Sequence, residues 1–114
     1  PAFAWIDSPA VKATVGQHVV AEGWGCKEGV GLQGVEVLLD GKVVGTANYG
    51  SPSPGTAAYW KFSKDPNHPD VGFHAQVDAS SVGPGRHWLG LRLHGADGSV
   101  EDWPEQPVVI RAGK

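Results

Sequence analysis

The chain has 114 residues, a formal net charge of −3 with neutral histidines, and a single cysteine. This length suits one domain, spanning residues 1–114, that buries enough apolar surface to fold without a disulfide or a metal. The acidic balance excludes the basic footprint of a nucleic-acid-binding domain, the lone cysteine excludes an internal disulfide and a cysteine-based zinc centre, and no apolar run approaches the roughly 18 residues of a membrane span.

Glycine and proline punctuate the whole chain, which contains 17 of the first and nine of the second. Five tryptophans and three phenylalanines favour a packed core over disorder. Short apolar runs between glycine, proline and aspartate are typical of an all-β sandwich or barrel. Because the chain begins at Pro1 without a methionine, we expect an excised fragment or a processed chain.

The first predicted strand covers Ala2 to Ile6, and the turn residues before Pro9 end it. Phe3 and Trp5 are interpreted as core and edge residues of this strand, since large apolar side chains in a small β-domain are usually buried.

The second predicted strand covers Gln17 to Trp24. Its small residues Ala21 and Gly23 are expected to permit close approach of the opposite sheet. Residues 25–34 are expected to form a glycine-rich connection, which lacks every phosphate-loop motif.

The clearest pattern is a β-hairpin from Val35 to Ala47. Apolar residues alternate on both arms, and Asp40-Gly41 supplies two residues that tolerate the positive φ of a type I′ turn. A two-residue turn predicts the facing pairs Leu39–Lys42, Leu38–Val43, Val37–Val44 and Val35–Thr46. Val35, Val37 and Val44 would then point inward, and Leu38 and Val43 would form an apolar outer pair. A bulge would shift this register.

The connection from residue 48 to residue 70 is the least regular part of the chain. It holds four prolines and several aromatic residues, and its 23 residues are long for a compact domain. We expect it to be functional, partly structured or mobile, with either a helical turn or an edge strand over residues 56–62.

The second half of the chain predicts three more strands, at residues 72–78, 86–94 and 99–111. In the second of these, Trp88 falls on the outer face and His87 on the inner face. Residues 95–98 form a hairpin turn, and Pro104 and Pro107 are expected to force an irregular or bulged stretch in the middle of the last strand. The fold class predicted is an all-β, immunoglobulin-like Greek-key sandwich of about seven strands without substantial helix.

Several segments together resemble bacterial immunoglobulin-like modules of larger secreted, cell-envelope or glycan-modifying proteins. The segments are Gly23-Trp24, Gly34–Gly50, Gly72–Asp78 and Pro84–Arg92, and the likeness runs from about Val11 to Ile110. The resemblance implies a spacer, docking or binding module, and an extracellular or cell-envelope location. The connection 48–70 departs from the usual pattern in length and aromatic content, so a specificity of this chain is expected there.

The candidate binding residues are exposed aromatic and apolar side chains, which can contact a neighbouring domain, a partner protein or the apolar faces of sugars. They are Leu38, Val43, Tyr59, Trp60, Trp88 and Arg92. For most of these rings, packing at the ends of the sandwich or under loops is the favoured interpretation. We expect a non-catalytic module that contacts neighbouring domains or a partner protein, with carbohydrate binding as the second hypothesis and no cofactor.

A metal site is a weaker hypothesis, resting on Asp65, His68, Asp70 and His74 within ten residues. Oxygen and imidazole ligands suit calcium or zinc, but the spacing matches no known metal motif. A solvated turn with side-chain capping is the favoured interpretation.

Catalysis finds little support in the sequence. There is no G-x-S-x-G nucleophile motif. The nearest grouping of suitable residues is Asp78, Ser80, Ser81 and His87. His87 is expected to be partly buried and hydrogen-bonded to a loop backbone.

Overall fold

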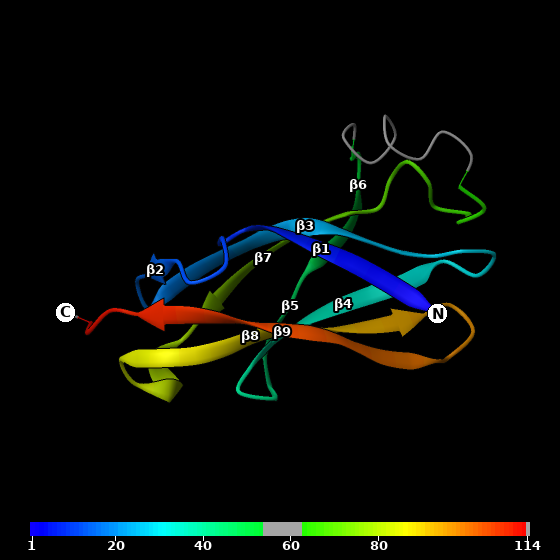
Figure 1. Ribbon diagram of the computed structural model, residues 1–114. Coiled ribbons are helices and arrows are strands. Elements are labelled where there is room, and N and C mark those ends of the chain that lie inside the picture. Colours follow the sequence, from blue (N-terminus) through cyan, green and yellow to red (C-terminus); the bar gives the residue numbers. More distant parts are fainter. Residues whose placement is uncertain (54–62, 114) are drawn as a thin grey trace.

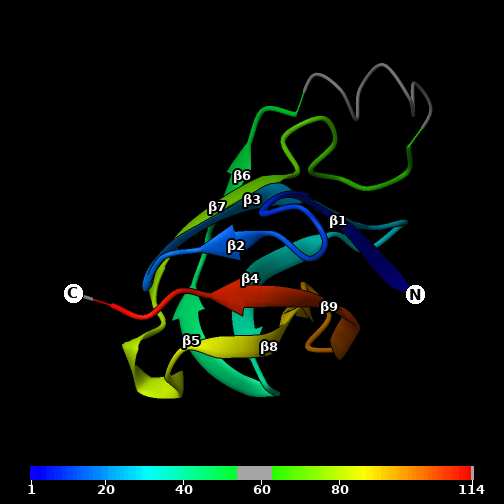
Figure 2. The same cartoon turned by 60° about the vertical axis from the view of Figure 1, so that its left-hand side comes forward.

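The computed structural model describes residues 1–53 and 63–113, which form two packed β-sheets (Figures 1 and 2). The first sheet has the order β1 (Ala2–Ser8), β3 (His18–Lys27), β7 (Gly72–Asp78) and β6 (Asn48–Ser51). The second has the order β2 (Thr14–Val15), β9 (Val100–Ile110), β8 (Gly85–Gly95), β4 (Leu32–Leu39) and β5 (Lys42–Thr46). One 3₁₀ turn, η1 (Ser80–Val82), precedes β8.

This arrangement confirms the predicted all-β sandwich. Neighbouring strands pair antiparallel except for the short pair β2–β9, and the chain passes between the sheets after β1, β2, β3, β5 and β7. The sequence predicted about seven strands. The two additional ones are the two-residue β2 and the four-residue β6, which forms at the start of the connection 48–70.

The core lies between the sheets, and the two sheets supply side chains of different size. The first sheet contributes many small residues, among them Ala4, Ala21 and Ala75, whereas the second contributes mainly valine, leucine and isoleucine. The largest fully buried side chains of the second sheet are Val35, Val37, Leu39, Leu89, Leu91, Leu93, Val108 and Ile110. Large aliphatic groups therefore fill the space that small residues leave, as close packing requires.

β3 runs further than the sequence predicted, to Lys27, so the connection to β4 is only residues 28–31. The structure also requires a glycine at position 23 for a different reason from the one expected. A Cβ there would lie 1.9 Å from the carbonyl oxygen of Trp5 and 2.9 Å from the ring of Phe73, both in the same sheet. The glycine that meets the opposite sheet is Gly25, whose Cβ would contact Leu32 and Leu93.

The interpretation of Phe3 as a core residue was wrong. Ala4 and Ile6 are the buried residues of β1, so Phe3 and Trp5 project from the outer face, where Trp5 is 59% exposed. Both faces of β1 are apolar, and side-chain volume decides between them: the narrow space above this sheet accepts alanine and isoleucine.

The predicted turn of the central hairpin is confirmed, but the predicted strand register was wrong beyond the first two pairs. Asp40 and Gly41 have φ values of 52° and 81°, as a type I′ turn requires, and Leu38 pairs with Val43. Beyond that pair the register shifts, because a bulge inserts one residue into β5. Gly45 therefore pairs with Val37 in place of Val44, and Thr46 pairs with Glu36 in place of Val35.

The second half of the chain folds as predicted. Alternate residues of β7 and β8 are buried, namely Phe73, Ala75, Val77, Leu89, Leu91 and Leu93. Trp88 points outward. β9 continues through Pro104, but its register with β8 shifts between Trp103 and Gln106, which confirms the irregular stretch.

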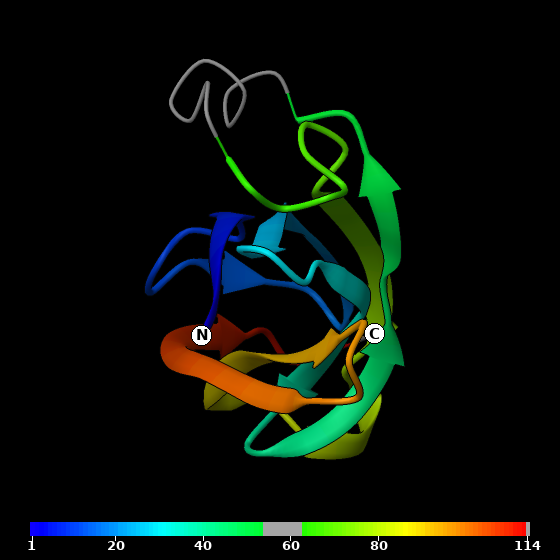
Figure 3. The ribbon, with the colours of Figure 1, turned by 90° about the vertical axis from the view of Figure 1, so that its right-hand side faces the viewer.

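The described part of the molecule is elongated, with principal extents of 45 × 28 × 19 Å. The N- and C-terminal ends lie at opposite ends of the long axis (Figure 1). Residues 63–71 lie outside the first sheet, beyond the end of β6, in two perpendicular views (Figures 1 and 3).

Replacing Gly23 with alanine should destabilise the fold by about 1–3 kcal/mol, because the new methyl group overlaps backbone that pairs β1 with β3. The matched control is Gly34→Ala in β4, where a Cβ meets nothing within 4 Å. That change should be neutral or stabilising by about 1 kcal/mol or less. Urea unfolding measures both, and equal effects of the two substitutions would contradict the assignment.

Candidate functional site

The outer side of β5, β4, β8 and β9 carries the predicted binding residues that the structure describes. Trp88 is 52% exposed and Val43 is 45% exposed, and Val100 is exposed at the other end of the surface. We call this surface the Trp88 face, after its largest exposed side chain. The strand order β9-β8-β4-β5 places Trp88 of β8 next to the hairpin formed by β4 and β5.

Leu38 lies on this side of the sheet but is only 3% exposed. It belongs to β4, which has β8 on one side and β5 on the other, and its partners in register are Gly90 and Val43. Leu38 therefore packs between these neighbours and exposes almost no surface to a partner. Its prediction as an exposed contact residue was wrong.

Arg92 is engaged within the Trp88 face. Its guanidinium donates two hydrogen bonds to Asp102, at 2.8 and 3.1 Å, and the bond to Asp102 raises the pKa of Arg92. His94 and Glu36 form a second pair across β8 and β4, at the edge of a shallow depression of about 370 Å³. These pairs at the surface contribute little stability, but the Arg92–Asp102 pair balances two opposite charges at one end of the face.

His87 and Asp40 fix the other end of the face. His87 Nδ1 lies 2.6 Å from Asp40 Oδ2, and Nε2 lies 2.9 Å from the carbonyl oxygen of Gly83. The second Asp40 oxygen accepts the backbone N–H of Trp88 at 2.9 Å. Both ring nitrogens face acceptors, so the doubly protonated imidazolium satisfies the site best, and the hydrogen bond to Asp40 raises the pKa of His87. The bond to Gly83 confirms the predicted contact with a loop backbone.

Of the other aromatic candidates, Tyr59 and Trp60 lie outside the described residues. Trp103, the tryptophan before Pro104, is partly buried and packs against the core.

The four metal candidates do not come together as a site. Asp65 is 4% exposed, and its two oxygens accept the backbone N–H groups of Asn67 and Lys27, each at 2.7 Å. His68 is half-buried in the same turn, Asp70 is exposed, and His74 lies away on β7. The bond to Asn67 is the side-chain cap that the sequence favoured. No group of three or more potential ligands lies together in the part of the chain described.

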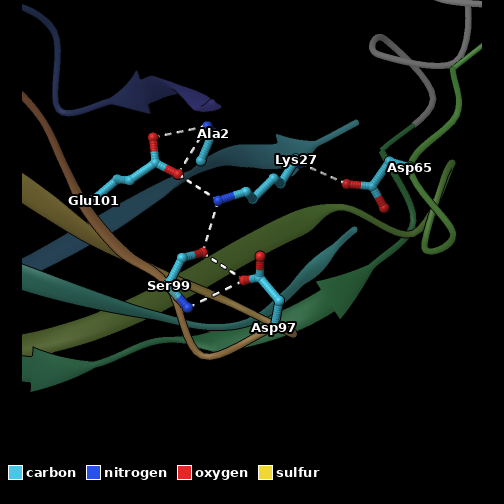
Figure 4. A network of polar contacts seen from close by, with 6 residues as sticks. All are labelled: Ala2, Lys27, Asp65, Asp97, Ser99 and Glu101. Atoms are coloured by element: carbon cyan, nitrogen blue, oxygen red, sulfur yellow. Dashed lines mark hydrogen bonds and ion pairs between the residues drawn. The ribbon is translucent and has the colours of Figure 1, made fainter. Parts of the chain in front are cut away.

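Asp65 belongs to a polar network that ties distant segments together (Figure 4). The Lys27 ammonium donates to Ser99 and to Glu101, each at 2.7 Å, and Glu101 accepts the backbone N–H of Ala2. The hydrogen bond to Glu101 raises the pKa of Lys27. The network joins the ends of β1, β3 and β9 to the turn at residue 65, and so has a structural role.

The described residues considered for catalysis make separate structural contacts. Asp78 accepts the backbone N–H of Ser80 at 2.8 Å, in the turn that leads into η1, while His87 bonds Asp40 and Gly83. Burial is the main cause that raises the pKa of Cys26 to about 12, so this thiol is protonated at neutral pH.

A second aromatic surface, which the sequence analysis missed, lies on the outer side of the first sheet. Trp5 and Trp24 are partners in register on β1 and β3, and Phe3 meets Trp24 edge to face at 5.7 Å between ring centroids. The small residues that alternate with these rings, such as Ala4, were the signal that could have placed them outside.

No protein-family model and no curated protein matches this sequence, but solved structures share its fold. A fibronectin(III)-like module of CbhA from Clostridium thermocellum has 15% identity and a TM-score of 0.58, covering 96% of each chain. The endo-β-1,4-mannanase from Thermotoga petrophila has 9% identity and a TM-score of 0.62, covering 100% of this chain and 20% of that one. CopC from Methylosinus trichosporium OB3b has 13% identity and a TM-score of 0.49, covering 96% and 94%.

The first two likenesses establish the fold, and at these identities they establish the fold alone. The predicted immunoglobulin-like, fibronectin-III-like sandwich is thereby confirmed, and the strand order agrees with it. The chain corresponds to about a fifth of the mannanase chain. Among the residues described, no helix has the length and apolar character needed to cross a bilayer.

The His87–Asp40 pair predicts a specific pH dependence of stability. Because the pKa of His87 is raised in the folded state, its contribution is complete below the unfolded value of about 6.5 and is lost as pH rises through the folded value. Asp40→Asn removes the charge and keeps the turn, since Asn-Gly also suits type I′. Between about pH 6 and pH 9 the wild type should lose up to about 1 kcal/mol more than the variant. Urea unfolding across this range checks it, and identical pH profiles would contradict it.

The buried carboxylate of Asp65 predicts a second effect. Asp65→Asn retains one acceptor for two N–H donors, so it should lower the free energy of unfolding by about 1–3 kcal/mol. The exposed neighbour change Asp70→Asn should stay within about 0.5 kcal/mol. Thermal melting with added Ca²⁺ or Zn²⁺ should leave the wild-type midpoint unchanged. A metal-induced rise that Asp70→Asn removes would instead indicate a metal site.

Proposed function

We propose that this chain is a non-catalytic accessory module of a larger bacterial protein, formed by residues 1–114 as one domain, and that it contacts a neighbouring domain or partner protein through the Trp88 face. The observation that carries the proposal is the exposure of Trp88 and Val43 on one side of the second sheet. A half-exposed tryptophan on a central strand leaves a large apolar area for a partner to cover.

The ion pairs of the Trp88 face support a protein contact. Arg92 and Asp102, and His94 and Glu36, already satisfy one another. A partner can therefore cover this end of the face and leave Arg92 and Asp102 paired, which avoids the main penalty of burying charged groups. The apolar end near the Asp40 turn would supply most of the binding free energy.

The fold and its dimensions support a role within a larger chain. The terminal ends at opposite ends of an elongated body (Figure 1) suit a module that stands between neighbours. Modules of this fold occur in CbhA, and a region of this fold forms a fifth of a mannanase chain.

Carbohydrate binding is the second candidate function. It is favoured by one observation, the exposure of indole rings on the outer faces of both sheets, at Trp5 and Trp88. Indoles present the flat apolar surface on which the C–H face of a sugar ring packs.

The contact proposal is tested by hydrogen exchange of the isolated module and of the full-length protein. The amides of β4, β5 and β8 should exchange at least several-fold more slowly in the full-length protein, because a partner covers the Trp88 face. Trp88→Ala should remove that difference. The control Val11→Ser alters a residue that is 59% exposed outside every strand, and should keep it. Equal exchange in the isolated and full-length forms would refute the contact.

A further inference from the structure

We infer that the outer face of β1 and β3 is a binding site for a β-1,4-linked hexose polysaccharide, with Trp5 and Trp24 as its stacking platform. This inference rests on the second candidate function and names its site. It uses the sheet opposite the Trp88 face, so the protein contact and the glycan site stand or fall separately. We call this surface the Trp5 face.

Two indoles stand side by side on the Trp5 face. Trp5 and Trp24 face each other in register on antiparallel neighbours, which brings their Cβ atoms within about 5.5 Å. Trp5 and Val11 are each 59% exposed, which is the largest exposed fraction among the large apolar residues described. The edge-to-face contact of Phe3 with Trp24, at 5.7 Å and 88°, holds the second ring from the side. The platform is therefore partly preorganised, which lowers the entropic cost of binding.

A row of polar side chains runs beside the indoles. Ser8, Glu22, His74 and Asn48 are successive partners in register across all four strands of the sheet. The next outward-facing residues along a strand lie roughly 7 Å away, so this row is parallel to the tryptophan pair. Among the described residues, the side chains of Glu22, His74 and Asn48 form no hydrogen bond or ion pair.

This combination matches the chemistry of a pyranose chain. The sugar ring has an apolar C–H face that packs on an indole, and equatorial hydroxyls at its rim that need hydrogen-bond partners. A carboxylate, an imidazole and an amide provide both acceptors and donors for them. A β-1,4-linked chain is extended and flat, as is the exposed side of a sheet, whereas an α-1,4-linked chain coils.

The same face suits other ligand classes poorly. No lysine or arginine of the described residues of β1, β3, β6 and β7 points outward from this sheet, because Lys27 is bound to Ser99 and Glu101. Phosphate-bearing ligands therefore find no cation here. Among the described residues of these strands, Val20 is the one large aliphatic side chain that is exposed, so these strands offer little of the aliphatic area of a typical protein interface.

The test is affinity electrophoresis in gels that contain galactomannan or hydroxyethyl cellulose, with amylose as the α-linked control. The wild type should be retarded by at least one of the two β-linked polymers and not by amylose. Trp5→Ala should weaken the interaction by roughly tenfold or more, since one stacked indole carries much of the binding free energy. Trp88→Ala is the matched control, an exposed tryptophan on the other sheet, and should change it less than twofold.

Two further variants keep the test decisive. Thermal melting reports whether Trp5→Ala is folded. If Trp5→Ala is unfolded, Trp5→Tyr tests the site in its place: it retains an aromatic ring and should keep most of the binding. Glu22→Ala should weaken binding several-fold without changing the melting midpoint. Absence of binding to both β-linked polymers, equal binding to amylose, or a larger loss in Trp88→Ala than in Trp5→Ala would overturn the inference. Slower exchange of β1 and β3 in the full-length protein would assign this face to a protein neighbour and also overturn it.

Discussion

The close approach of the two sheets is the constraint on which the rest of this structure depends. The inner side of β3 can carry only small residues near its end, because a Cβ at Gly25 would already lie 3.0 Å from Leu32, and the same limit holds at Gly45, where a Cβ would lie 2.5 Å from Val77. The second sheet fills the remaining space with leucine and valine. Phe73 is the large ring that this core holds, while the indoles of Trp5, Trp24 and Trp88 project from the outer sides of the sheets. The surfaces available for binding are thus a consequence of how the core is packed.

The sequence predicted the fold well wherever polarity alternates along a strand. In β7 and β8 one side is apolar and the other mostly polar, so the buried residues, including Leu91, could be assigned before the structure was known. The type I′ turn could be predicted for a similar reason, because it depends only on the two adjacent residues Asp40 and Gly41. β1 could not be assigned in this way, because Ala4 and Trp5 are both apolar and only the size of the space between the sheets separates them. The bulge in β5 shifts the register of the hairpin without any marker in composition.

The candidate sites show a similar limit. Trp88 was found because it alternates with leucines on a single strand. The Trp5 face depends on pairing between β1 and β3 and between β3 and β7, so its residues are brought together from positions far apart in the chain. The network of Lys27 joins residues 38 to 74 positions apart, and explains why Asp65 is buried although the sequence offered it as a metal ligand. Long-range pairs of this kind are fixed by topology, which a single sequence specifies only indirectly.

The two outer faces differ in how their polar groups are satisfied, and this difference is the physical basis for giving them different roles. On the Trp88 face, carboxylates meet cations within the chain, as Asp102 meets Arg92, so covering it with protein leaves few groups unpaired. On the Trp5 face, Glu22 forms no ion pair with another described residue, and burying its carboxylate against an apolar partner would be unfavourable. A ligand rich in hydroxyl groups avoids that penalty because it supplies donors where the carboxylate needs them. This contrast in charge pairing is why we propose a protein contact for the Trp88 face and a glycan site for the Trp5 face.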